Sequence, residues 1–180
     1  MKVLIHGCCG PCLIMPLAGL AGEGAETRVF FYNPNIHPYT EWEKRRETLT
    51  AHCEREGAPL LPVPEYDISE WFRAIAYRET QRCRLCYYLR LRETAKVAKK
   101  GKFDCFTTSL LCSKYQKHEL IRETGEEVSK EFDVPFLYRD WRDDWEEGVR
   151  RSRELSMYRQ PYCGCLYSET ERYREKGAAK

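Results

Sequence analysis

The sequence predicts an α/β fold, a Rossmann-like three-layer sandwich with a mostly parallel sheet and a helical, cysteine-bearing C-terminal segment. The first observation behind this prediction is that short apolar runs alternate with longer amphipathic segments along the chain. Strands that alternate with helices are typical of parallel sheets covered by helices on both faces. The second observation is that the 180 residues contain no repeat, low-complexity tract or linker, so a single domain over residues 1–180 is expected.

In the first half of the chain we expect two strands, a helix and a weaker third strand, in the order 3–5, 29–32, 39–56 and 60–63. The first two strands are runs of β-branched, leucine or aromatic residues, which suit a buried sheet. Pro38 and Gly57 bound the helix as start and stop signals. The last segment is weaker because prolines interrupt it, and proline cannot donate to a strand ladder.

In the second half we expect a helix, a strand, a second helix and a final strand, in the order 84–100, 103–108, 114–131 and 135–138. Beyond residue 140 no strand pattern is evident, and a helical, charged tail is expected to end near the cysteines at 163 and 165. Functional sites gather at the carboxyl ends of parallel strands. The loops after the first two strands, at 8–9 and 33–37, should therefore share one rim of the sheet.

Ten cysteines are the most unusual feature of the composition. The longest uncharged stretch, residues 7–22, is broken by glycines and prolines and is too short to cross a bilayer, so a cytoplasmic protein without a membrane partner is expected. Because the cytoplasm keeps thiols reduced, metal binding or redox chemistry is expected rather than structural disulfides. Seven of the ten fall into three groups, namely Cys8, Cys9 and Cys12; Cys83 and Cys86; and Cys163 and Cys165.

The spacing within these groups favours metal binding. Cys83 and Cys86 are three residues apart at the start of a predicted helix and share one face, and Gly164 lets the chain fold back between the last two cysteines. A structural zinc ion and a [4Fe–4S] cluster each take four ligands, which leaves about three thiols over and suggests a second metal. Spacing alone does not identify the metal. The remaining cysteines stand apart and are expected to be buried and inert: Cys53, Cys105 and Cys112.

Three other classes of protein compete for this pattern. The Cys-Gly-Pro-Cys turn at 9–12 is typical of a thioredoxin- or glutaredoxin-like dithiol oxidoreductase, although that mechanism leaves the other clustered thiols without a role. A non-catalytic, zinc-dependent RNA-binding module is the second alternative. A tRNA-thiolating enzyme is disfavoured, because residues 7–12 offer side chains that suit metal rather than a Gly-rich pyrophosphate loop.

The net charge of +2 hides a basic segment. Residues 78–102 carry nine Lys or Arg against two Glu, a local charge of +7. Such a surface suits a polyanion such as RNA, and a solvated helix face is the alternative interpretation. Because the fork of arginine matches phosphate geometry, the candidate phosphate contacts are Arg82, Arg84, Arg90 and Arg92.

Five ordered segments resemble the epoxyqueuosine reductases of the QueH type across nearly the whole chain. These segments are HGCCGPC (6–12), FYNPNIHPYTEWEKR (31–45), RCRLCYYLRLRETA (82–95), TTSLLCSKYQ (107–116) and SMYRQPYCGCLYS (156–168). The resemblance implies a metal-binding catalytic domain, an oxidoreductase of queuosine biosynthesis that reduces the epoxide of epoxyqueuosine to queuosine at the tRNA wobble position.

The same resemblance implies an iron–sulfur cluster of the [4Fe–4S] kind beside a further mononuclear metal, iron. The cluster-binding positions that match are Cys8, Cys9, Cys83, Cys86, Cys163 and Cys165, with Cys12 as a further metal ligand. The division of the seven thiols between the two centres stays open. An external one-electron donor of the ferredoxin or flavodoxin type is expected to supply the electrons.

The reaction also needs a proton donor and contacts to the tRNA. A donor must lie within hydrogen-bond reach of the epoxide oxygen, and the target base must be splayed out of the anticodon loop. The candidate proton donors are His37, Asp67, Tyr158 and Tyr162, with a loop-ordering role as the alternative for His37. The candidate contacts to the tRNA or its modified base are Asn33, Asn35, Arg82, Arg84, Arg159 and Gln160.

Overall fold

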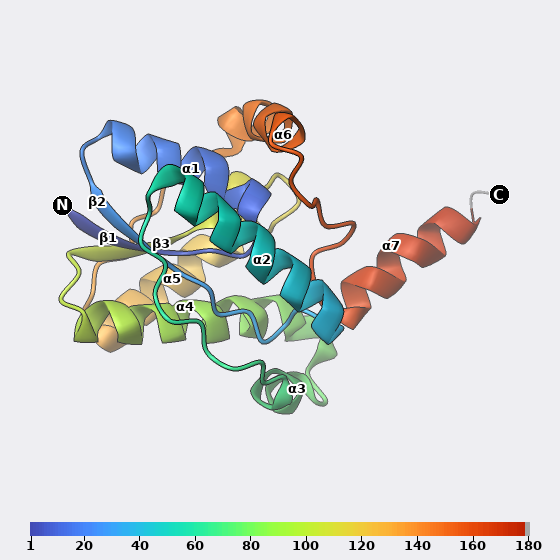
Figure 1. Ribbon diagram of the computed structural model, residues 1–180. Coiled ribbons are helices and arrows are strands. Elements are labelled where there is room, and N and C mark those ends of the chain that lie inside the picture. The colour runs from blue at the N-terminus through green and yellow to red at the C-terminus, as the bar shows by residue number, and fades with distance from the viewer. Residues whose placement is uncertain (179–180) are drawn as a thin grey trace.

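The computed structural model describes residues 1–178 and is built around a parallel sheet of three strands (Figure 1). The strands are β1 (Lys2–His6), β2 (Glu26–Phe30) and β3 (Cys105–Thr108), in the spatial order β2-β1-β3. The central strand β1 pairs Lys2 with Glu26 on one side and Val3 with Cys105 on the other. Its residues 3–5 are fully buried, as expected for a strand covered on both faces.

Two of the predicted strands are not strands in the structure. Residues 60–63 and 135–138 contribute only isolated parallel bridges, Leu60 to Val29 and Phe136 to Phe106. Prolines flank both bridges, and because proline has no N–H to donate, the ladder does not extend beyond one pair. The second predicted strand, 29–32, is also displaced and covers Glu26–Phe30.

Seven α-helices and three short 3₁₀ turns make up the rest of the described chain. The helices are α1 (Gly10–Gly22), α2 (Tyr39–Glu56), α3 (Ser69–Ile75), α4 (Arg82–Lys100), α5 (His118–Phe132), α6 (Trp145–Glu154) and α7 (Leu166–Ala178). The 3₁₀ turns are Glu79–Gln81, Ser109–Cys112 and Arg142–Asp144. The predicted bounds of α2 are confirmed, and the left-handed φ of +64° at Gly57 explains why the helix ends there. The predicted helix 114–131 starts four residues later, at His118.

The helices form layers on the two faces of the sheet. Figure 1 shows α4 and α5 beneath the sheet and α1 above it, with α2 and α6 beside α1. This arrangement confirms the predicted α/β sandwich. Helix α3 was not predicted, because seven residues are too few to show a helical period.

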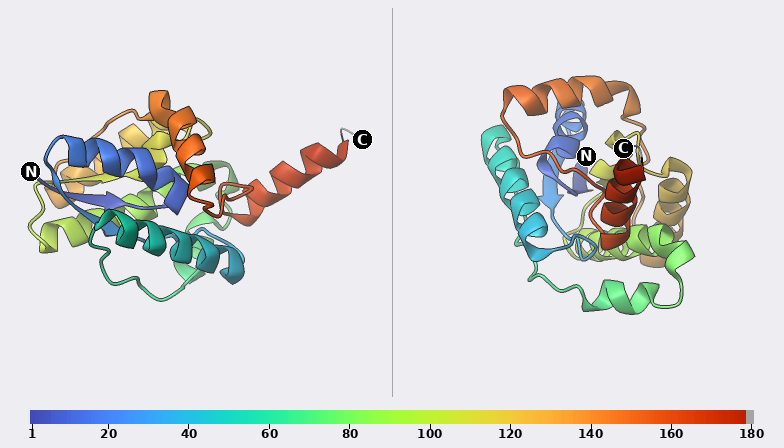
Figure 2. Two further views of the ribbon diagram at one scale, coloured as in Figure 1. Left: turned by 45° about the horizontal axis from the view of Figure 1, so that its top comes forward. Right: turned by 90° about the vertical axis from the view of Figure 1, so that its right-hand side faces the viewer.

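The C-terminal segment is helical, as predicted, and returns to the carboxyl ends of the strands. After α6, residues 155–165, here named the strap, run across the strand ends, and α7 then projects away from the body (Figure 2). Within residues 1–178, no helix combines the length and apolarity needed to cross a membrane.

Candidate metal centre

The first group of thiols forms the turn between β1 and α1. Helix α1 begins at Gly10 with proline in its first turn, which brings Cys12 back over the preceding Cys8 and Cys9. The three Sγ atoms lie within 4.8 Å of one another, and all three residues are buried. Among the described residues, no other three cysteine, histidine or acidic side chains come this close.

Hydrogen bonding makes these three thiols unequal. Contacts from Cys12 and Cys9, together with Ser109, lower the pKa of Cys8 well below its usual value in spite of burial. Burial raises the pKa of Cys9, and the hydrogen bond with Cys8 raises that of Cys12. Deprotonation is therefore easiest at Cys8, and the remaining protons would leave as a metal binds.

The geometry of this group fits a metal ion. The Sγ atoms of Cys8 and Cys9 are 3.7 Å apart. Two thiolates on one tetrahedral ion, each about 2.3 Å from the metal, lie about 3.8 Å apart. All ten cysteines, which lie within the described residues, are free thiols, so no disulfide competes for these sulfurs.

The second group joins two distant parts of the chain. Cys83 and Cys86 lie in the first turn of α4, as predicted, and the strap carries Cys163 and Cys165. Burial raises the pKa of Cys86 to about 12; Arg90 opposes this shift, while the three other thiols of the group add to it. Cys165 packs against the same small apolar cluster that contains Cys86 and Trp71.

A buried ion pair holds the strap in place. Arg45 on α2 is 1% exposed, and its Nε donates to Glu41 at 2.7 Å. Its two terminal nitrogens donate to the carbonyl oxygens of Cys163 at 2.8 Å and Tyr162 at 3.0 Å. Glu41 also accepts a hydrogen bond from the Tyr158 hydroxyl. One ion pair thus fixes both ends of the strap segment that leads to the last two cysteines.

Gly164 allows the strap to approach the loop after β2. Its φ of +147° lies in the region that favours glycine, and a Cβ there would lie 3.1 Å from both Asn35 Nδ2 and Ile36 Cγ1. The backbone N–H of His37 donates to the Gly164 carbonyl oxygen at 2.8 Å. The loops after the first two strands also meet, since Asn33 Nδ2 donates to the Gly7 carbonyl oxygen at 3.0 Å. The predicted shared rim is confirmed.

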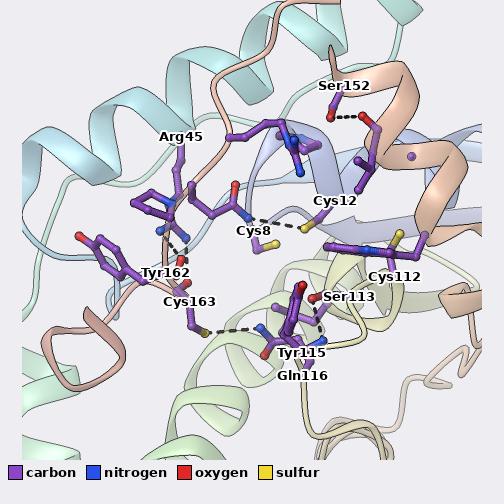
Figure 3. Close-up of a pocket in the computed structure, with 18 of the residues that line it drawn as sticks. Cys8, Cys12, Arg45, Cys112, Ser113, Tyr115, Gln116, Ser152, Tyr162 and Cys163 are labelled. Carbon is purple, nitrogen blue, oxygen red and sulfur yellow. Dashed lines mark hydrogen bonds between the residues drawn. The ribbon is translucent and has the colours of Figure 1, made fainter. Parts of the chain in front are cut away.

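A cavity of about 400 Å³ opens between the strand ends, α6 and the strap (Figure 3). Cys8 and Cys12 line one wall and Cys163 lines another, and Figure 3 shows all three turned toward the same space. Cavities of this size hold nucleoside-sized ligands. Cys112 also lines the cavity, although burial raises its pKa to about 12 and keeps it protonated.

Three of the residues predicted from the sequence line this cavity: Arg159, Gln160 and Tyr162. The Gln160 amide donates to Cys9 Sγ at 3.0 Å and lies 3.7 Å from Cys12 Sγ. The Tyr162 hydroxyl donates to the carbonyl oxygen of His37, and burial raises its pKa to about 12.

Three predicted proton donors lie elsewhere: Tyr158, whose hydroxyl donates to Glu41, and the two residues His37 and Asp67. His37 is 3% exposed and packs on Trp71 and Phe72, and burial lowers its pKa to about 4, so it is neutral at pH 7. Its Nε2 contacts the Pro34 carbonyl oxygen, which favours the loop-ordering role. Asp67 is exposed and accepts from the Ser69 backbone N–H at the start of α3. None of these three side chains lines the thiol cavity.

The basic segment is largely neutralised in the structure. Arg82 pairs with Glu171, Arg84 pairs with Glu127 at 2.6 Å, and Arg92 pairs with Glu70 at 2.5 Å. Arg90 is 2% exposed, so the prediction that it contacts phosphate is wrong. A count of charges does not show that Arg90 lies on the buried face of α4. The solvated-face interpretation fits most of this segment better than a free cationic surface.

Sequence reasoning gave no role to Arg45 and Gln116, and a surface role to Arg90, yet all three shape the site. Gln116 Nε2 donates to Cys163 Sγ at 3.4 Å, while its Oε1 accepts from the Tyr87 hydroxyl at 2.9 Å, which fixes its orientation. All three residues lie within the segments that carry the family resemblance, and that was the available signal.

Comparison with known proteins agrees with this resemblance. The family model described as epoxyqueuosine reductase QueH matches residues 3–171. A protein of that name from Dehalococcoides mccartyi is 36% identical, over 96% of this chain and 94% of its own length. The Thermotoga maritima protein is also 36% identical, over 98% and 94%, and the Haemophilus influenzae protein is 32% identical, over 97% and 75%.

A solved structure supports the fold alone. It is described as a predicted subunit of tRNA methyltransferase from Methanocaldococcus jannaschii, and it superposes with a TM-score of 0.58 at 11% identity. It covers 86% of this chain and 75% of its own. The full-length family match confirms the sequence-based prediction over the dithiol and zinc-module alternatives: the chain belongs to the epoxyqueuosine reductase QueH family of oxidoreductases.

Proposed function

We propose that this chain reduces the epoxide of epoxyqueuosine to the alkene of queuosine, at the wobble position of tRNA, inside the thiol-lined cavity. Family membership supports the reaction, and one structural observation supports the position of the active site. Three buried thiols in mutual contact lie beside a cavity of about 400 Å³ that is large enough for a modified nucleobase. The overall change consumes two electrons and two protons and releases the epoxide oxygen as water.

We further propose that the two thiol groups hold different metals. Sulfurs within 4.8 Å of one another suit a single ion, so Cys8, Cys9 and Cys12 would hold the mononuclear iron. A [4Fe–4S] cube keeps its four thiolates farther apart, which suits Cys83, Cys86, Cys163 and Cys165. Bound there, these groups would supply one-electron transfer and a Lewis acid for the epoxide oxygen.

The residues around the cavity would orient the substrate and supply protons. Gln160 contacts Cys9 and Cys12 and faces the cavity, so its amide is placed to hold a polar group of the modified base beside the first thiol group. Tyr162 is the one predicted proton donor that lines the cavity, and to act as one its hydroxyl would have to release the His37 carbonyl oxygen to which it donates. His37 and Asp67 are assigned to ordering the loop and the start of α3.

The mouth of the cavity is suited to the anticodon loop. Arg159 and Arg172 line the cavity and both are exposed, and Arg159 has no carboxylate oxygen within 4.0 Å among the side chains of residues 1–174. Tyr115, which is 79% exposed, lies edge-on against Trp145 and offers a ring on which a splayed base can stack. Exposed cations and an exposed aromatic ring are the features with which proteins bind single-stranded RNA loops.

The test is anaerobic purification with iron and sulfide counts, followed by incubation with epoxyqueuosine-containing tRNA and a low-potential reductant such as reduced flavodoxin. Nucleosides are then identified by mass spectrometry. Wild type should bind iron and sulfide and produce queuosine, Cys163→Ala should lose the sulfide, the iron of the cluster and turnover, and Cys53→Ala should keep all three. A colourless wild-type protein that holds zinc alone, or full turnover in Cys163→Ala, would overturn the proposal.

A further inference from the structure

Arg90 is a buried arginine without a carboxylate partner. It lies on the third turn of α4, is 2% exposed, and packs over the Tyr87 ring at 5.6 Å. Its Nε donates to the Cys86 carbonyl oxygen, and a terminal nitrogen donates to Cys86 Sγ, both at 3.1 Å. Among the side chains of residues 1–174, which the structure describes, no carboxylate oxygen lies within 4.0 Å of its guanidinium.

Arg45 shows what a compensated buried arginine looks like in the same protein. Arg45 is equally buried but lies 2.6 Å from a carboxylate oxygen of Glu41. A guanidinium stays charged at any pH at which the protein is folded, so Arg90 cannot avoid its burial by losing a proton. A buried charge without a counter-charge is strongly destabilising, and the missing partner must come from something that Arg90 touches.

The sulfur that Arg90 contacts is Cys86 Sγ, whose pKa burial raises to about 12, so this thiol is neutral in the metal-free protein and becomes an anion only when it binds a metal. The Cys163 and Cys8 thiols are also near enough to act electrostatically on the guanidinium, after Cys86. Arg90 in turn acts on His6, where burial and then the nearby guanidinium lower the pKa to about 4. The guanidinium is bound directly to a candidate cluster ligand, through its hydrogen bond to Cys86 Sγ.

We propose that Arg90 is the built-in counter-charge of the metal centre and that it raises the reduction potential of the cluster. The inference rests on the proposed function, because it presumes a thiolate-ligated centre at Cys86. Each electron that enters such a centre adds a negative charge, which a fixed positive charge and a hydrogen bond to a ligand sulfur both stabilise. Arg90 is a positioning residue that does not contact the epoxide.

The decisive measurement is the midpoint potential of the iron-loaded protein, followed by EPR during a potentiometric titration. Arg90→Gln should be harder to reduce than wild type, with the equilibrium constant for one-electron reduction lowered at least about tenfold, which is about 59 mV. Arg92→Gln is the matched control, since Arg92 is on the same helix but is paired with Glu70 and Glu93, and its potential should equal that of wild type.

Arg90→Lys separates charge from shape. It should keep iron and sulfide and have a potential closer to wild type than that of Arg90→Gln. An unchanged reduction potential in Arg90→Gln would overturn the proposal. Loss of the cluster in both Arg90→Gln and Arg90→Lys would also overturn it, because the cluster would then depend on the shape of the arginine side chain and not on its charge. Wild type without iron would instead defeat the proposed function, so the two failures are distinguishable.

The metal-free protein gives a readout independent of the loaded enzyme. In the metal-free protein the buried charge of Arg90 has no anionic partner and destabilises the fold. Metal-free Arg90→Met should therefore unfold at a higher temperature than metal-free wild type. Reconstitution with iron and sulfide should cancel or reverse this order. If metal-free Arg90→Met is the less stable protein, the guanidinium already has its counter-charge within the polypeptide, and the proposal is overturned.

Discussion

The two thiol groups contrast in how the chain builds them. Cys8, Cys9 and Cys12 lie within five residues, on a turn between the central strand and the helix that covers it. Cys86 and Cys163 are 77 residues apart in the sequence, and Cys163 comes near enough to act on the pKa of Cys86 because the strap crosses the strand ends. The first group is therefore formed whenever the sheet is formed, whereas the second also requires the strap to be held, which is what Arg45 does.

The largest expected effect is that substitutions in the two thiol groups remove different metals. Cys8→Ala should lose about one iron per chain and keep its sulfide, whereas Cys86→Ala should lose the sulfide and about four irons. Turnover should fall to background in both variants. Iron and acid-labile sulfide analysis after anaerobic purification provides the measurement, with Cys105→Ala as a control because this thiol is buried beside Met1, away from the cavity. Loss of sulfide from Cys8→Ala would reverse the assignment.

The next effect concerns the strap. Arg45→Met leaves Glu41 buried without its partner, and breaking such a pair costs about 3–5 kcal/mol in the free energy of unfolding. Arg46→Gln on the same helix removes an exposed pair with Glu43 and should cost less than about 1 kcal/mol. Urea unfolding of the metal-free proteins measures both. Equal costs for the two variants would show that the ion pair does not hold the strap.

A smaller effect depends on pH, through the loop that contacts the strap. The folded-state pKa of His37 is about 4 and its ordinary value is 6.5, so the unfolded chain binds more protons between these values. The free energy of unfolding therefore decreases as the pH falls through this window, by about 2 kcal/mol from pH 7 to pH 5 for this residue. Denaturant titrations at the two pH values should show a smaller decrease for His37→Gln. A variant with the wild-type pH dependence would contradict the burial of a neutral ring.

The smallest effect concerns tRNA at the mouth of the cavity. Arg159→Gln and Arg172→Gln should each weaken tRNA binding by about 1 kcal/mol, roughly fivefold, and reduce the slope of log affinity against log salt by about one. Arg84→Gln is the control, because Glu127 already neutralises that arginine. Binding titrations over a range of salt concentrations provide the measurement. An equal loss of tRNA affinity in Arg84→Gln would indicate that the basic face of α4 contacts the tRNA.

Features that depend on local chemistry were predictable from the sequence. Helix α2 lies between a proline and a glycine whose backbone preferences act on their own neighbours, so its bounds were confirmed. The shared rim followed from the parallel sheet, because consecutive strands of such a sheet end at the same edge. The grouping of the cysteines also indicated a metal centre, because thiols that are three residues or fewer apart in the sequence are near each other in space.

Tertiary packing decided the surroundings of individual side chains, which the sequence alone does not show. A count of charges gave Arg84 and Arg90 the same role, yet one faces solvent beside a glutamate and the other is buried beneath the thiols. Likewise His37 is a titratable residue on the predicted rim, but its ring turns onto Trp71 and is neutral. The pattern of residue types determines which elements form and which thiols are neighbours. The direction in which each side chain points, and therefore its charge and its partner, is set by whatever distant segment packs against it.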